Sequence, residues 1–336
     1  GRSLAMKRVR RDQQVMPGPG TIGSATSPTT LPSDRVQPAT RDLIALRHAA
    51  EGLSLGATRV RSLQGQNYLS AFKGRGMEFD ESRPYTAGDD IRSLDWRVMA
   101  RTGRPHTKLF REERERPVIV AVDYRPAMFF ATQGSFKSVQ AARCAALLAW
   151  RAAQQGDRLG GFIFSARDHW EGRPGLGSAA TLHFLQQLAT RGRIDRTPAE
   201  REANLEAYGR AVARLRRVAR PGSLIVLISD FRNLDAAAEA HLAQLSRHSE
   251  LVMIFVYDPL EMQLPPAGQY RVADGDRQLL LDTRTQRARS DYAQRFQRRR
   301  NRIRQLCQRQ RMIFLPCATN DDPLLRLQQG LRLRQP

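Results

Sequence analysis

VIVAVD at residues 118–123 and SLIVLISD at residues 223–230 are the two stretches that decide the fold class. Each is a continuous apolar run ending in an aspartate, as expected of a strand buried on both faces of a parallel sheet. Asp123 and Asp230 then fall at the carboxyl ends of their strands, where ligands bind in open α/β sheets. If the two strands lie side by side, we expect both carboxylates to meet at one crevice.

Helical and strand patterns alternate around these two runs. Ser135 begins an apolar helical stretch that Gly156 ends. Three further strands are expected at RLGGFIFS (158–165), LVMIFVYD (251–258) and MIFLP (312–316). The segments YRVAD and RQLLLD predict a hairpin. Alternation of this kind, with right-handed crossovers, predicts a doubly wound, mainly parallel α/β sheet.

Composition divides the chain into three regions. Residues 1–40 are rich in Pro, Gly, Ser and Thr, which predicts a disordered tail. Residues 41–116 combine a leucine-bearing helical stretch with short, glycine-interrupted segments, which predicts a small mixed helix and strand appendage. Residues 117–333 carry the α/β pattern and form the predicted main domain.

The overall composition is that of a globular protein, because 41% of the 336 residues are hydrophobic and 26% are charged. No apolar run approaches the roughly 20 residues needed to cross a bilayer, and the first residues lack the apolar core of a secretory signal. Three cysteines without a CxxC pair fit a reducing compartment. We therefore expect a cytoplasmic protein.

Charge is the most unusual feature of the composition. The net charge is +22, and all but four of the 55 basic residues are arginines. Residues 284–311 hold eleven arginines and one acid, but Tyr292, Phe296, Ile303 and Leu306 recur among them at near-helical spacing. This pattern favours an amphipathic surface helix with arginines on its outer face. Nucleic-acid binding by the arginine surface remains the alternative.

Several segments resemble a known family. RGMEFDESRPYTAGDDIRSLDW (75–96), the strand VIVAVD, LISDF (227–231) and YDPLEMQLPPAG (257–268) are similar to the bacterial family called domain of unknown function 58, over about residues 66–333. The resemblance implies a von Willebrand factor type A-like domain with a small N-terminal appendage. It also implies a MoxR-type AAA+ ATPase as partner, with the type A-like domain coupling the ATPase to an unidentified client protein.

The resemblance also raises the question of a metal site. Type A domains hold Mg²⁺ on an Asp-x-Ser-x-Ser loop, with a threonine and a second aspartate from other loops, and Mg²⁺ requires six oxygen ligands in an octahedron. Here the loop begins at Asp123, but Arg125 and Ala127 replace the two serines. Asp230 matches the distal aspartate, and Thr197 is the nearest candidate threonine. We expect a degenerate site in which Arg125 supplies the counter-charge of an aspartate; Mg²⁺ at Asp123 and Asp230 is the alternative.

The family signature in the appendage has a structural interpretation. Asp89 or Asp90 is expected to cap the following turn, and Trp96 to cover the join between the two subdomains. An ion-pair network is expected from Arg83, Asp95 and Arg101. Together with Arg125, these are the candidate interaction residues.

No catalytic pattern is present in the sequence. GRGMEF lacks the GK[ST] of a phosphate loop, so ATP hydrolysis is not supported, and the six histidines form no ligand pattern. The sequence therefore predicts a non-enzymatic protein-binding adaptor or assembly factor that needs no cofactor. The alternatives are a nucleic-acid-associated protein and a metal-dependent hydrolase built around Asp123 and Asp230.

Overall fold

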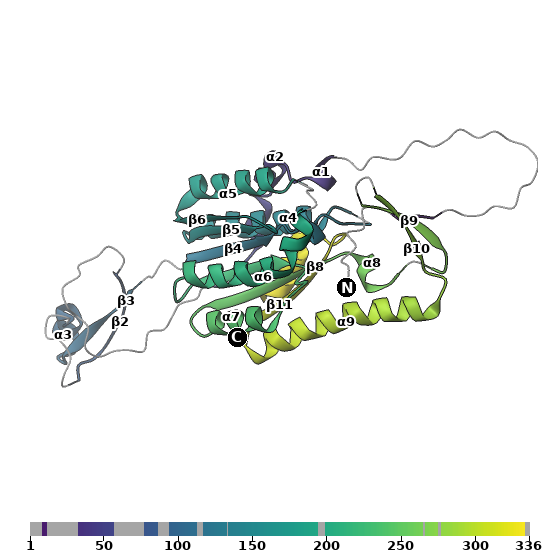
Figure 1. Cartoon of the computed structure of the whole chain (residues 1–336). Helices are drawn as coiled ribbons and strands as arrows, with labels where there is room; N and C mark the ends of the chain where they lie inside the picture. Colours follow the sequence, from purple (N-terminus) through teal and green to yellow (C-terminus); the bar gives the residue numbers. More distant parts are fainter. Residues whose placement is uncertain are drawn as a thin grey trace, which may run out of the picture. The chain divides into compact units, whose positions relative to one another are not determined.

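The structure is a computed structural model. It describes residues 9–11, 33–56, 77–86, 94–112, 117–132, 134–193, 199–264, 266–274 and 277–332. The chain forms two compact units (Figure 1): residues 1–56 and 116–336 make the first, and residues 57–115 make the second.

The first unit is built on a six-stranded sheet in the order β11-β8-β7-β4-β5-β6. Its strands are β4 (Pro117–Asp123), β5 (Arg158–Phe164), β6 (His169–Gly175), β7 (Leu224–Ser229), β8 (Glu250–Tyr257) and β11 (Ile313–Ala318). All neighbours pair in parallel except β5 and β6. The strand order reverses between β4 and β7, so their carboxyl ends form the switch point of the sheet. The predicted doubly wound, mainly parallel sheet is confirmed.

The central strand β4 is buried on both faces, which explains its unbroken apolar sequence. Val118, Val120 and Val122 belong to one hydrophobic cluster, whereas Ile119 and Ala121 belong to the other. Side chains alternate between the two faces of a strand, so both faces must be apolar when helices cover both.

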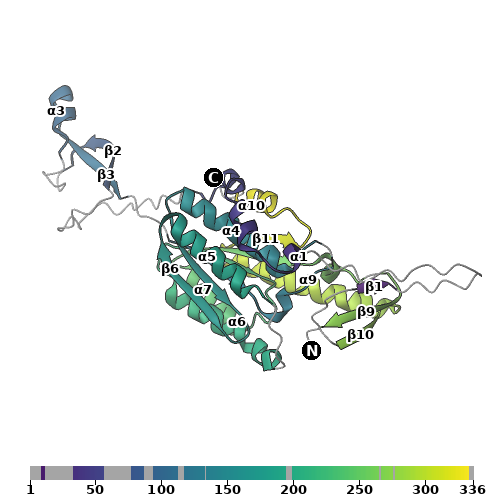
Figure 2. The ribbon, with the colours of Figure 1, turned by 90° about the horizontal axis from the view of Figure 1, so that it is seen from above.

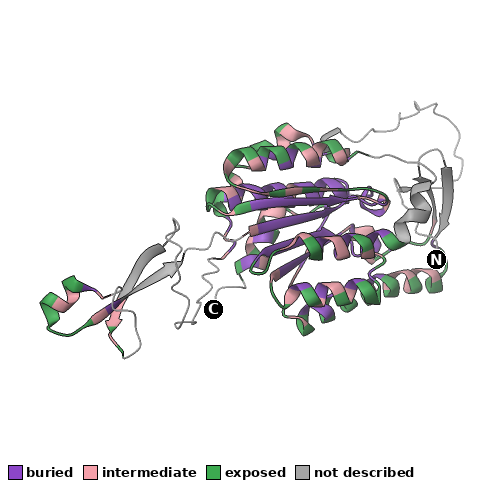
Figure 3. Ribbon diagram, turned by 60° about the vertical axis from the view of Figure 1, so that its left-hand side comes forward, coloured by how far each residue is buried: buried purple, intermediate pink, exposed green. Residues whose placement is uncertain are grey.

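Helices cover both faces of this sheet, and the strands between them are buried (Figures 1 and 3). One face carries α2 (Thr40–Ala45), α4 (Lys137–Gln154), α5 (Gly177–Arg191) and α10 (Pro323–Arg332). The other carries α6 (Ala199–Val218), α7 (Ala236–Ser246) and α9 (Gln286–Arg309). As predicted, α4 ends just before Gly156, whose φ of 78° favours glycine. Within the described part of the chain, none of these helices has the length and apolar character needed to cross a membrane.

A separate antiparallel sheet contains β1 (Val9–Arg11), β9 (Gln269–Asp274) and β10 (Arg277–Asp282). Figure 2 shows β1 beside β9 and β10. The pairing of β9 with β10 confirms the predicted hairpin. The helix α9 follows β10 and buries Phe296, Ile303 and Leu306, so the arginine-rich segment is the predicted amphipathic surface helix.

The structure places the start of the α/β domain earlier than the sequence prediction did. The segment predicted as a disordered tail contains β1 and the helix α1 (Ser33–Val36), and its residues 1–8 and 12–32 lie outside the described residues. The N–H of Phe136 donates to the carbonyl of Arg35 at 2.8 Å. Leucines assigned to the appendage are buried in the main core, namely Leu43, Leu53 and Leu55. Composition missed this boundary because it does not show which distant surface such leucines pack against.

The described part of the second unit is small and contains both strands and a helix. It contains the antiparallel strands β2 (Met77–Pro84) and β3 (His106–Glu112) and the helix α3 (Trp96–Thr102). Between β2 and α3, Leu94 forms an isolated bridge with Thr107 of β3.

Candidate functional site

Asp123 and Asp230 lie at the switch point of the sheet. Asp123 is the last residue of β4, Asp230 follows β7, and the two strands pair directly, with Val122 opposite Ile228. Both aspartates are fully buried. The structure brings them to one guanidinium: Nη2 of Arg125 lies 2.7 Å from Oδ2 of Asp123 and 3.8 Å from Oδ1 of Asp230.

Arg125 clamps Asp123 from within the same loop. Its Nε donates to Oδ1 at 3.0 Å and its Nη2 to Oδ2 at 2.7 Å, which is the strong bidentate arrangement. Ser229 donates through Oγ to Oδ2 of Asp123 at 2.6 Å. The guanidinium carbon lies 4.8 Å from the centre of the Tyr208 ring, a favourable cation–π contact. Arg125 is 1% exposed, so this counter-charge is fixed inside the protein.

A second buried cation, Lys137, forms an ion pair with Asp230. Lys137 is the first residue of α4 and is fully buried; its Nζ donates to Oδ2 of Asp230 at 2.9 Å and to Oε1 of Glu261 at 2.7 Å. Glu261 lies on the short helix α8 (Pro259–Met262), which follows β8. Arg232 donates to Oε1 of Glu261 at 2.8 Å, and Arg299 of α9 donates to Oε2 at 3.1 Å.

These side chains form one charge cluster, which we call the strand-end network; five of its members are buried, and Arg232 and Arg299 are partly exposed. Its members are Asp123, Arg125, Lys137, Asp230, Arg232, Glu261 and Arg299. The network links the segments that follow β4, β7 and β8 to the helices α4 and α9. It therefore fixes the loops at the carboxyl edge of the sheet in one arrangement.

The network keeps two of its carboxylates, those of Asp230 and Glu261, ionised. Burial by itself raises the pKa of Asp230, but the charges of Lys137 and Arg232 outweigh burial and hold this pKa well below its usual range. The pKa of Glu261 is also lowered: burial raises it, and the same two cations more than offset that rise. A general base works best with a pKa near the operating pH. Neither carboxylate meets that condition.

The residues at the strand ends do not fit a magnesium ion. Both oxygens of Asp123 already accept hydrogen bonds from Arg125, and the guanidinium stands where a cation would have to bind. Ala127 offers a buried methyl group in place of a hydroxyl, and Thr197 lies outside the described residues. Across the described ranges, no three His, Cys, Asp or Glu side chains gather in a way that would hold a metal.

We expect Mg²⁺ to leave the melting temperature of the protein unchanged. A site with a Kd of about 0.1 mM would gain about 2.7 kcal/mol at roughly 10 mM Mg²⁺, one hundred times that Kd. Such a gain would raise the melting temperature by roughly 5–11 °C in a domain of this size. Differential scanning calorimetry with increasing MgCl₂, matched in ionic strength by NaCl, measures this. A saturable rise with MgCl₂ alone would mean that the network opens to admit the ion.

The signature residues of the second unit have mostly local roles. Oδ1 of Asp95 accepts hydrogen bonds from the N–H groups of Arg97 and Val98 at 3.1 and 3.3 Å, so Asp95 caps α3. Asp95 also accepts from Oγ of Ser82 at 2.7 Å. The side chain of Arg83 donates to the carbonyl of Pro84.

Four other signature residues do not reveal a role. Arg101 is exposed, and Trp96 is 60% exposed. Asp89 and Asp90, the predicted caps, lie outside the described residues. The ion-pair network of Arg83, Asp95 and Arg101 stays a prediction.

Sequence reasoning predicted Arg125 as a counter-charge but missed the other partners of the two aspartates in the network. Lys137 left a usable signal, because it is one of only four lysines and begins a helix, where a cation is unfavourable. Glu261 lies within the quoted segment YDPLEMQLPPAG but has no distinctive spacing. Arg232 and Arg299 could not be told apart from the many other arginines.

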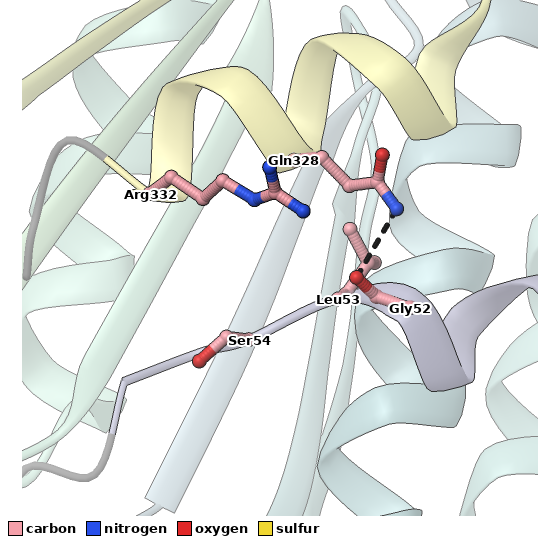
Figure 4. Close-up of a pocket in the computed structure, with 5 residues that line it drawn as sticks. All are labelled: Gly52, Leu53, Ser54, Gln328 and Arg332. Atoms are coloured by element: carbon pink, nitrogen blue, oxygen red, sulfur yellow. Dashed lines mark hydrogen bonds between the residues drawn. The ribbon is translucent and has the colours of Figure 1, made fainter.

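A pocket of about 460 Å³ lies away from the network, beside α10 (Figure 4). It is lined by Gly52, Leu53, Ser54, Gln328 and Arg332. Nε2 of Gln328 donates to the carbonyl of Gly52 at 3.1 Å. The lining holds one charged group and no acid, histidine or cysteine, so it suggests no reaction.

Two of the solved structures that resemble this chain show limited similarity to it. One is described as conserved hypothetical protein BatB from Bacteroides thetaiotaomicron, with a TM-score of 0.39 and 16% identity over 65% of this chain and 98% of that chain. The other is described as an aerotolerance-related membrane protein from Bacteroides fragilis, with a TM-score of 0.36 and 18% identity over 65% and 99%.

Sequence comparisons identify the family. Uncharacterized proteins of Mycobacterium bovis and Mycobacterium tuberculosis are 32% identical to this chain over 212 residues, which is 62% of this chain and 64% of each relative. This chain thus spans less than two thirds of their length. The family model described as "Protein of unknown function DUF58" matches residues 81–302. The chain therefore belongs to the DUF58 family.

Proposed function

We propose that this protein is a non-enzymatic protein-binding module. It acts as an adaptor or assembly factor, works with a MoxR-type AAA+ ATPase and an unidentified client protein, and uses no cofactor. The observation that carries the proposal is the strand-end network, which fills with ion pairs the edge of the sheet where doubly wound folds bind ligands.

The chemistry of the network favours binding over turnover. Its buried carboxylates are paired with cations, and the pKa values of Asp230 and Glu261 are held low, so neither takes up a proton near neutral pH. Nucleophilic catalysis also needs a nucleophile activated by an adjacent base. The hydroxyl of Ser229 donates to the already paired Asp123 instead of to a free base.

The same network provides what a binding module needs. A rigid surface loses little conformational entropy when a partner docks, which preserves affinity. Here the ion pairs of the strand-end network hold the loops after β4, β7 and β8 in place from the protein interior. The outer surfaces of these three loops therefore form a preorganised binding surface, which we call the platform. The partner itself is inferred from the family resemblance.

The proposal predicts a complex with a MoxR-type AAA+ ATPase from the same organism. We expect the purified full chain to bind that ATPase in at least one nucleotide state, and the chain alone to hydrolyse no ATP because it lacks a phosphate loop. Biolayer interferometry with ATP, ADP or a non-hydrolysable analogue measures binding, and a phosphate-release assay measures turnover.

A matched pair of variants sharpens this experiment. Arg232→Gln alters a network residue whose side chain is 23% exposed, and Arg210→Gln alters an arginine on α6 whose side chain is 56% exposed. Binding should weaken only in the first variant if the platform is the docking surface. Absence of a complex in every nucleotide state would contradict the partnership, and ATP turnover by the chain alone would contradict the non-enzymatic assignment.

A further inference from the structure

The outer face of α9 carries a row of arginines that is interrupted at two positions, by Asp291 and Gln305. Positions 287, 291, 295, 298, 302, 305 and 309 follow one another at intervals of three or four residues, so they share one face of the helix. All seven residues are exposed. Five of them form what we call the arginine stripe, namely Arg287, Arg295, Arg298, Arg302 and Arg309. At 1.5 Å per residue, the stripe is about 33 Å long.

Most of the charge on this stripe has no counter-charge. Arg302 is paired, with its Nε 2.6 Å from Oε1 of Glu239 on α7. In the described part of the chain, the other four stripe arginines have no carboxylate partner, and Asp291 is the one acid on this face. Like charges three or four residues apart on a helix repel one another. A polyanion lying along the helix would remove this repulsion.

The surface lacks what other anionic partners would require. Protein interfaces rely on a core of apolar and aromatic anchors. The large hydrophobic side chains exposed in the described part of the chain are Ile44, Trp96, Leu176, Leu182 and Leu325, and none lies on α9. A membrane-surface helix inserts its apolar face into the lipid, whereas α9 turns Phe296 and Ile303 into the protein core.

Double-stranded nucleic acid fits these observations best. A duplex carries one negative charge per roughly 1.7 Å of its axis, so a stripe of about 33 Å meets many phosphates. Single-stranded nucleic acid is held largely by stacking of bases on aromatic rings. The aromatic residues of α9 offer no such platform, because Phe296 is buried and Tyr292 is only partly exposed.

We propose that the arginine stripe of α9 binds the phosphate backbone of double-stranded nucleic acid without sequence preference. Arginine contacts to phosphate position a protein on a duplex but carry no sequence information. This activity is separate from the proposed adaptor function, because the stripe lies on the outer face of α9 and the network is buried beneath the strand ends.

The test uses the full chain and a fluorescein-labelled duplex DNA of arbitrary sequence, with anisotropy measured across a NaCl series. We expect a Kd of about 10⁻⁴ to 10⁻⁶ M at physiological salt. The affinity should fall steeply as the salt concentration rises. The variant Arg295→Gln/Arg298→Gln/Arg309→Gln should weaken binding by about tenfold or more. Its slope of log K against log salt should be shallower by about 2–3, because each lost phosphate contact contributes about 0.9.

A matched control removes the same charge elsewhere. Arg41, Arg167 and Arg193 are exposed arginines outside α9, and their joint replacement by glutamine should leave the affinity within about twofold and the slope unchanged. Both triple variants should keep the wild-type melting temperature, since the substituted side chains are exposed.

Three results would overturn the proposal. The first is a Kd weaker than about 10⁻⁴ M at physiological salt. The second is an equal loss of affinity for the duplex in the stripe variant and in the control variant, which would mean that only the overall charge of the protein matters. The third is stripe-dependent binding to phosphatidylserine vesicles or to polyglutamate with no stripe-dependent binding to the duplex.

Discussion

Replacing Arg125 by methionine is expected to lower the free energy of unfolding by about 3–5 kcal/mol, the loss typical when one partner of a buried ion pair is removed. The substitution leaves the fully buried carboxylate of Asp123 without its bidentate partner. Methionine fills similar space but cannot donate a hydrogen bond, so Ser229 and the backbone N–H of residue 125 would remain as donors. The melting temperature should fall by roughly 6–20 °C. Urea denaturation followed by circular dichroism measures the change.

Two further variants separate the charge effect from packing. In Asp123→Asn/Arg125→Met, no unpaired charge is left buried, so much of the lost stability should return. Arg298→Met removes an exposed arginine and should change the free energy of unfolding by no more than about 0.5 kcal/mol. If Arg125→Met is as mild as Arg298→Met, the guanidinium is not the buried counter-charge of Asp123.

Replacing Glu261 by glutamine is expected to cost about 3 kcal/mol or more near neutral pH, because Lys137, Arg232 and Arg299 all lose their shared anion. The effect should depend on pH. The pKa of Glu261 is lowered in the folded protein, since the charges of nearby cations outweigh the opposing effect of burial. A carboxyl group with a lowered folded pKa stabilises the fold above its unfolded pKa, which is about 4.3 for glutamate. That stabilisation is lost as the pH falls through the folded pKa.

The wild-type protein should therefore lose stability steeply below about pH 4, and Glu261→Gln should lose less over the same interval. Urea denaturation near neutral pH and at about pH 3 measures how much stability the wild type and Glu261→Gln each lose as the pH falls. The matched control is Glu206→Gln, because Glu206 pairs with Arg210 on the surface of α6 and its side chain is 84% exposed. Exposed pairs contribute little, so this control should behave like the wild type at both pH values. Parallel acid slopes for wild type and Glu261→Gln would contradict the proposed role of Glu261.

The parts of the fold that the sequence predicted are those with strong local signals. β4 and β7 are central strands between two helical layers, so their apolar runs are long and end sharply at Asp123 and Ser229. The strand β6 was missed because it is a partly exposed edge strand with the sequence HWEGRPG, in which glycine and proline hide the strand pattern. The domain boundary was placed too late because it depends on long-range packing of leucines.

The candidate site was predicted only in part for a similar reason. Asp123, Arg125 and Asp230 could be placed together, because each is tied to the end of a recognisable strand. Lys137 and Glu261 reach the site from α4 and α8, and only the folded arrangement brings them within 2.7 Å of each other. Pairings between residues more than 100 positions apart leave no periodicity that a single sequence can show.

We propose that buried cations, and no metal, neutralise the strand-end aspartates. A crystal structure of the protein soaked in Mn²⁺ tests this proposal. Mn²⁺ stands in for Mg²⁺ at oxygen-rich sites and gives an anomalous signal. We predict no anomalous peak between Asp123 and Asp230, with the guanidinium of Arg125 in bidentate contact with Asp123. An anomalous peak coordinated by both aspartates, with Arg125 displaced toward solvent, would mean that a metal ion neutralises the two carboxylates.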